Sequence, residues 1–148
     1  GENINYIGDC AFAQCSSLTD VEINLNTSLP YAIFAECGAL ENVTISKLNG
    51  EVGGSAFYAC NKLKTIEFSE GVTKLQKYAF YQCKKIDRIS IPKIINVYEW
   101  TFYQCSEVTI DIGWSNLEFI GVRAFSDCPK LVSEFKKSSL FLFVAQRI

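Results

Sequence analysis

The sequence predicts a solenoid of stacked repeats, and two regularities support this fold class. Phenylalanine recurs at intervals of 22 or 23 residues along the 148-residue chain, at Phe12, Phe34, Phe57, Phe80, Phe102 and Phe125. Each Phe is followed by Cys at the third position and by an aliphatic residue at the sixth. A unit of this size cannot bury its own apolar face, so each repeat needs a neighbour to complete its core.

The whole chain, residues 1–148, is expected to form one domain. Residues 1–11 match the end of a preceding repeat, and the residues after 137 lack the repeat pattern. The expected repeats lie near residues 12–33, 34–56, 57–79, 80–101, 102–124 and 125–137. Residues 138–148 are expected to form an atypical C-terminal tail. Because the chain opens on Gly1 in mid-pattern, we read it as a piece of a longer repeat protein.

Alternating apolar residues after each Phe-x-x-Cys segment predict one short β-strand per repeat. In the first repeat, Val21 and Ile23 are expected to face the core, while Asp20 and Glu22 face outward. In the fifth repeat the alternation starts one residue early, at Val108, so a bend or bulge before the strand must absorb the difference. In the sixth repeat the strand pattern is degraded.

The segments that lead back to the next Phe also carry a regular signal. An aliphatic residue stands five positions before each Phe, at Ile7, Leu29, Val52, Leu75, Val97 and Ile120. The Ala-Phe-x-x-Cys segment itself is expected to form a brief helical or 3₁₀ turn, because so few residues cannot support a longer helix.

Six of the seven cysteines occupy one repeat position, at Cys15, Cys37, Cys60, Cys83, Cys105 and Cys128. If the repeats stack at the inter-strand spacing of about 4.8 Å, equivalent Cβ atoms lie slightly too far apart for a disulfide. A zinc site needs four converging ligands, and the chain has no close Cys pair and no His. We therefore expect these cysteines to act as small buried hydrophobic residues.

The composition excludes several classes of function. A net charge of −2 provides no electrostatic basis for binding nucleic acid or an anionic membrane surface. The longest uncharged apolar run, residues 140–145, is far shorter than the ~20 residues that cross a bilayer, so we expect no direct membrane insertion by this chain.

The fuller repeat string, Ile-Gly-x-x-Ala-Phe-x-x-Cys-x-x-Leu-x-x-Val-x-Ile, resembles the BspA-like, or Treponema-type, leucine-rich repeats. Residues 120–131 carry its first half almost unaltered, and the likeness extends over residues 4–135. The resemblance implies a curved, right-handed leucine-rich-repeat solenoid with a parallel β-sheet on its concave face. Short strands and 3₁₀ or helical turns would then form the return side. Many such repeats occur in surface proteins of bacteria and protists that bind host or matrix proteins.

No catalytic, cofactor-binding or metal-binding residues are predicted, and we expect a protein that is not an enzyme. Without His the chain has no ordinary Ser-His or Cys-His nucleophile pair. It also lacks a Gly-rich phosphate loop. Asp20 and Glu22 share one face, but two exposed acids on a strand are usually just solvated.

Protein binding by the outward residues of the predicted concave sheet is the leading functional hypothesis. A stacked solenoid creates an extended concave surface, and short polar side chains on it offer many hydrogen-bonding groups. The candidates are Asp20, Glu22, Asn42, Thr44, Thr65, Glu67, Arg88, Ser90, Thr109 and Asp111. The alternative is that these are ordinary solvated strand positions.

A second candidate patch is aromatic. Tyr58, Tyr81 and Tyr103 each follow a Phe in consecutive repeats, so they are expected to stack on the return side, near Tyr78 and Trp100. Tyr and Trp are favoured interface anchors. Alternatively, the rings simply cover one another between repeats.

Two classes of function fit the sequence. The first is an adhesin-like or receptor-like module at the cell surface or secreted, binding a host or matrix protein. Asn26-Thr27-Ser28 and Asn42-Val43-Thr44 match glycosylation sequons and favour secretion slightly. The second is an intracellular scaffold or structural spacer in the cytoplasm, which the unpaired cysteines favour slightly.

Overall fold

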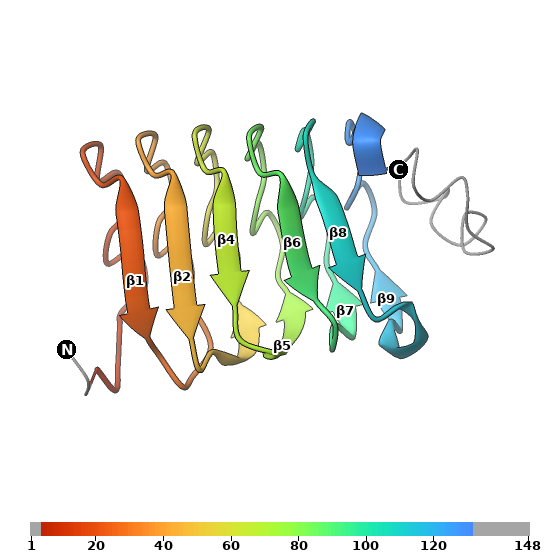
Figure 1. Ribbon diagram of the computed structural model, residues 1–148, viewed down its shortest axis with the longest axis horizontal. Helices are drawn as coiled ribbons and strands as arrows, with labels where there is room; N and C mark the ends of the chain where they lie inside the picture. The colour runs from red at the N-terminus through yellow and green to blue at the C-terminus, as the bar shows by residue number, and fades with distance from the viewer. Residues whose placement is uncertain (1–3, 132–148) are drawn as a thin grey trace.

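A front row of parallel strands, one from each of five successive repeats, is the main feature of the computed structural model (Figure 1). The structure describes residues 4–131. The front strands are β1 (Asp20–Asn24), β2 (Asn42–Ser46), β4 (Thr65–Phe68), β6 (Arg88–Ile91) and β8 (Thr109–Ile112). They form because apolar residues alternate with polar ones, which places one set of side chains in the core and the other on the surface. The predicted β-solenoid of stacked parallel strands is confirmed.

A second parallel sheet lies on the return side of the repeats. It contains β3 (Asn49–Val52), β5 (Gly71–Leu75), β7 (Asn96–Val97) and β9 (Phe119–Ile120), hydrogen-bonded in that order. A short 3₁₀ helix, η1 (Trp114–Asn116), precedes β9. The aliphatic residues that stand five positions before each Phe lie in or beside this sheet, and from Leu29 to Ile120 they are buried.

The Phe column forms the centre of the core between the two sheets. Phe34, Phe57, Phe80, Phe102 and Phe125 are all at most 1% exposed. Consecutive rings stack with centroids 5.3–5.8 Å apart. Phe12 is 40% exposed, because within the described residues only Phe34 stacks on its ring, at 5.6 Å. The repeat spacing therefore identified the core correctly.

The segment around each Phe is a series of tight turns, so the predicted helical or 3₁₀ conformation is wrong. In every repeat, the residues two positions before and two positions after the Phe have positive φ, for example Ser55 at 54° and Ala59 at 55°. This backbone alternation directs every second N–H along the solenoid axis. In the third repeat, Ser55, Phe57 and Ala59 each donate to a carbonyl of the next repeat at 2.8–2.9 Å.

The fifth repeat, in which the stretch from the Phe to the strand is one residue shorter, keeps its strand in register. β8 pairs with β6 from Arg88↔Thr109 to Ile91↔Ile112 with no shift, so the missing residue comes from the link between the turn and the strand. The change thus precedes the strand, as predicted. The degraded strand expected in the last repeat and the tail 138–148 lie outside the described residues.

Candidate functional site

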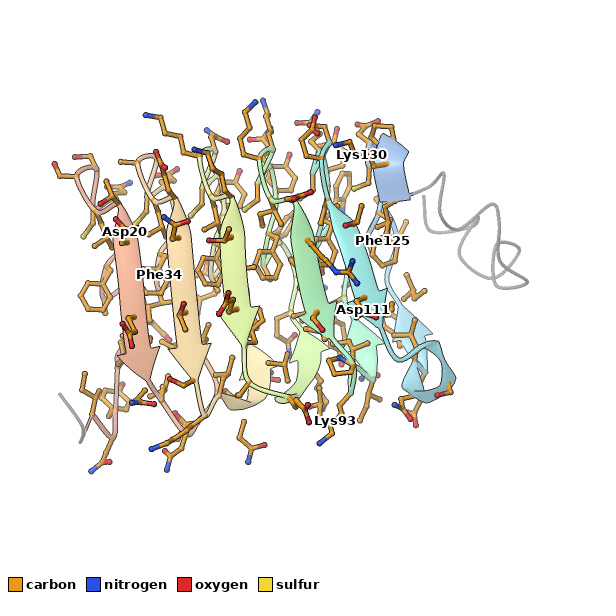
Figure 2. All side chains as sticks on the ribbon, viewed as in Figure 1. Asp20, Phe34, Lys93, Asp111, Phe125 and Lys130 are labelled. Atoms are coloured by element: carbon orange, nitrogen blue, oxygen red, sulfur yellow. The ribbon has the colours of Figure 1, made fainter. Side chains whose placement is uncertain are left out.

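The ten predicted binding residues lie on the front strands in two rows that cross the repeats. The strands pair in parallel, and their register places Asn42 beside Asp20 and Thr65 beside Asn42. Two residues further along each strand, the same register forms a second row. The first row is Asp20, Asn42, Thr65, Arg88 and Thr109, and the second is Glu22, Thr44, Glu67, Ser90 and Asp111. Figure 2 labels Asp20 and Asp111, which belong to the two outermost front strands. We call this surface the front face.

Side chains of the first row bond to one another across the strands. Asn42 Nδ2 donates to Asp20 Oδ1 at 2.7 Å, and Thr65 Oγ1 donates to Asn42 Oδ1 at 2.7 Å. The hydrogen bond from Asn42, with a second from Thr19, lowers the pKa of Asp20 below its ordinary value. Asp20 therefore remains a carboxylate at neutral pH, and its row presents a preset pattern of donors and acceptors.

The front face is acidic. Among the ten residues, Asp20, Glu22, Glu67 and Asp111 carry four negative charges against the single positive charge of Arg88, a net of −3. Arg88 also forms an ion pair with Asp111 at 3.4 Å, in which both side chains are more than half exposed. A pair this exposed adds little stability, so both groups remain able to meet a partner.

The front row divides between β4 and β6. β1, β2 and β4 form one hydrogen-bonded sheet and β6 and β8 form another, and Figure 1 shows the wider gap between them. Phe68 stands at the division, in the inward position where the other front strands have Ile23, Ile45, Ile91 and Ile112. Its ring packs against Phe80 with centroids 6.3 Å apart, and we attribute the separation of the strands to this larger side chain. A hollow of about 320 Å³ opens there, lined by Ile66, Glu67, Phe68, Arg88 and Ser90.

The cysteine column is buried, but its members are more than apolar filler. From Cys37 onward, each thiol donates to the backbone carbonyl of the Phe in the preceding repeat at 2.8–3.1 Å. Burial raises the pKa of Cys60 and of Cys128 to about 12, and those of Cys83 and Cys105 well above the usual value. These thiols stay protonated at neutral pH and are poor nucleophiles. All seven cysteines of the chain are free.

The tyrosines predicted to stack on the return side do so. Tyr58 and Tyr81 are 4.9 Å apart between ring centroids, and Tyr81 and Tyr103 are 5.1 Å apart. Tyr78 and Trp100 meet this stack edge-on, at 5.5 Å from Tyr81 and 5.0 Å from Tyr103. Whether this patch binds a partner stays a prediction.

Neither a metal site nor a membrane span emerges from the described part of the chain. Within residues 4–131 no group of three or more His, Cys, Asp or Glu side chains converges in a way that could hold a metal ion. In the same range no helix has the length and apolar character needed to cross a bilayer.

The stacked parallel strands, the buried Phe column and the repeated turns define a β-solenoid repeat protein. Among such proteins, the chain belongs to the family described as the BspA type leucine rich repeat region, whose model matches residues 1–47 and 27–142 in six copies. Leucine-rich repeat families are typically non-catalytic and serve in general as protein-interaction modules. No curated protein matches the chain.

Solved structures with a similar fold come from three bacteria. A leucine-rich repeat protein from Bacteroides ovatus ATCC 8483 is 20% identical with a TM-score of 0.67, over 86% of this chain and 39% of that one. A leucine rich cell surface protein from Faecalibacterium prausnitzii A2-165 is 24% identical with a TM-score of 0.68, over 84% and 41%. The leucine rich repeat protein of T. pallidum is 23% identical with a TM-score of 0.64, over 71% and 50%. The chain thus spans half or less of the length of these relatives, and the likeness concerns the fold.

Proposed function

We propose that the chain is a non-catalytic protein-binding module that holds its partner on the front face. The observation that carries this proposal is the pair of polar rows, in which ten side chains from five strands share one surface. The strands fix the positions of these side chains, so a partner that binds them orders few additional groups.

The charge of the front face favours a basic protein surface as the partner. A net charge of −3 among ten residues attracts Lys and Arg side chains and disfavours acidic surfaces. The hollow between β4 and β6 presents Glu67 beside apolar Phe68 and Ile66, and Arg88, which also lines it, is paired with Asp111. Glu67 and the apolar side chains suit a long side chain with an apolar stem and a positively charged end.

An adhesin-like or receptor-like role at the cell surface is the more specific proposal. It is supported by the similarity of fold to the F. prausnitzii protein, which is described as a cell surface protein. The alternative, an intracellular scaffold or spacer, is supported by the seven free thiols, because unpaired cysteines are commoner in reducing compartments.

An unbiased pull-down tests the proposal. The chain serves as bait for extracellular matrix proteins and, separately, for a cytosolic lysate. The double variant Thr44→Arg, Glu67→Arg places two large cations in the second row of the front face. We expect a partner of the unchanged chain to bind this variant at least about tenfold more weakly, because like charges then face each other at the centre of the interface.

A matched control variant distinguishes the effect of where the substitutions lie from the effect of the added positive charge. Thr27→Arg, Glu118→Arg alters the net charge by the same amount at exposed loop positions away from the front face. It should retain the partner. Equal loss in both variants would show a general charge effect, and retention in both would remove the front face from the binding site.

A further inference from the structure

The two ends of the aromatic patch on the return side differ. We call Tyr58, Tyr78, Tyr81, Trp100 and Tyr103 the aromatic platform. At its C-terminal end the guanidinium carbon of Arg123 lies over the Trp100 ring, 5.0 Å from the ring centroid. Tyr78, Trp100 and Arg123 occupy the same position in successive repeats, two residues before the Phe. The chain therefore closes this end of the platform with its own cation, in a cation–π contact.

The N-terminal end of the platform opens into a pocket. The Tyr ladder stops at Tyr58, because the preceding repeat has Ala35 at the equivalent position. The place where the next ring of the ladder would stand belongs to a hollow of about 540 Å³ whose lining includes Tyr58 and Ala35. Tyr78 borders this hollow beside Tyr58, so aromatic carbon forms much of its wall.

Tyr31 forms a further wall of this pocket. Its ring lies against Gly54, where a Cβ atom would stand 3.4 Å from the ring. The equivalent position in the next repeat is Lys77, so the absence of a side chain at residue 54 leaves the Tyr31 ring room to lean along the solenoid. Tyr31 is 55% exposed, which leaves part of its ring available to a ligand.

A carboxylate completes the pocket. Glu36 lies on its lining and is exposed, and one of its oxygens, Oε2, accepts a hydrogen bond from Gln14 Nε2 at 2.7 Å. That bond orients the carboxylate at the edge of the hollow. Aromatic faces together with a negative charge make up the surroundings that a protein offers to an organic cation.

We propose that this pocket binds the arginine side chain of a protein partner. The planar guanidinium stacks on the exposed face of Tyr58, as Arg123 stacks on Trp100, and its N–H groups donate to Glu36. The aliphatic stem packs on Ala35 in the floor. An arginine fits better than a lysine, because the ammonium group is more strongly hydrated and cannot stack. This inference does not depend on the front face, since the pocket belongs to the turns on the return side.

The test uses the intact chain and the peptide acetyl-Gly-Arg-Gly-amide as the probe, followed by NMR of the tyrosine rings. The comparison peptide contains citrulline, which has nearly the shape of arginine without its charge. We expect saturable shifts of the Tyr58 and Tyr31 ring signals with the arginine peptide. The citrulline peptide should bind about threefold to tenfold more weakly, as the loss of one exposed charge contact implies.

Variants then locate the site. Glu36→Gln changes an exposed side chain and leaves the fold intact, and it should weaken binding of the arginine peptide about threefold or more. Tyr58→Leu should abolish the shift of the Tyr31 ring signal, whereas Tyr103→Leu, at the other end of the platform, should leave the affinity unchanged. Equal affinity for citrulline, full binding by the Glu36→Gln variant, or no saturable shift with the unchanged chain would each overturn the proposal.

Discussion

At the scale of the residue, each buried cysteine from Cys37 onward both fills space in the core and donates a hydrogen bond to the preceding repeat. The carbonyl of Phe57 accepts the backbone N–H of Cys60 at 3.2 Å and the thiol of Cys83 at 3.0 Å. Ala or Val at residue 83 would fill part of the space without supplying the second donor. The hydrogen bond between a thiol and a carbonyl is weak, but it recurs in every repeat from Cys37 to Cys128. The column therefore joins each repeat to the one before it.

The raised thiol pKa values predict a loss of stability at high pH. A thiol whose pKa is higher in the folded state stabilises the fold fully below its unfolded pKa, near 8.5–9, and loses this contribution as the pH rises toward the folded value. Cys60 has a folded pKa of about 12, so its contribution should lower the free energy of unfolding by about 1–2 kcal/mol as the pH rises from 8 to 10. Urea unfolding at the two pH values measures the summed loss from Cys60, Cys83, Cys105 and Cys128, which should exceed the contribution of Cys60 alone.

Removing one thiol supplies the control for that experiment. Cys83→Ala should lower the unfolding free energy at pH 7 by about 1–2 kcal/mol, through the lost sulfur volume and the lost donor. It should also make the decrease between pH 8 and pH 10 smaller, because one fewer thiol ionises on unfolding. The same decrease in both proteins would mean that other groups with a raised pKa, such as Tyr81, cause it.

At the scale of the element, the turn around each Phe depends on residues with positive φ. None of these twelve residues is Gly, although Gly adopts this conformation most easily. The conformation persists because it aims alternate N–H groups at the next repeat, as Ala59 does toward the Tyr81 carbonyl at 2.8 Å. The ladder of these hydrogen bonds between successive repeats offsets the local backbone strain.

Substitutions at Ala59 test this account of the turn. Ala59→Val places a β-branched residue at φ 55° and should lower the unfolding free energy by about 1–2 kcal/mol. Ala59→Gly relieves the strain and should change stability by no more than about 1 kcal/mol. Urea unfolding compares both with Ala35→Val, at a half-buried turn position outside the positive-φ set. If Val at residue 59 were tolerated as well as Val at residue 35, the turn would not impose its conformation.

At the scale of the whole molecule, periodicity predicted the core and both faces of the solenoid. The Phe interval and the alternation of apolar residues sufficed, because stacking repeats superimpose equivalent positions. The conformation of the turns was mispredicted, because residues such as Ser55, Tyr78 and Trp100 do not by their type indicate positive φ. The division beside Phe68 was missed as well, although an aromatic residue in a column of Ile was a visible signal.

Other features of the candidate sites depend on contacts between repeats. The hydrogen bond from Asn42 to Asp20 requires that β1 and β2 pair in the observed register. The alternating pattern of the sequence restricts this register but does not fully specify it. The pocket beside Tyr58 arises from one missing ring at Ala35. That difference can be seen in the aligned repeats, but the leaning Tyr31 ring and the position of Glu36 cannot. The faces were thus predictable, whereas the hollows on them were not.

Site-specific photo-crosslinking tests the central claim, that a protein partner binds the front face, most directly. A benzoylphenylalanine residue replaces Thr44 in the second row or, in a separate protein, Tyr103 on the return side. Both positions are half-buried, so the two probes have comparable access. The account predicts that the partner from the pull-down forms an adduct at residue 44 and not at residue 103. An adduct at residue 103 alone would contradict it and assign binding to the return side.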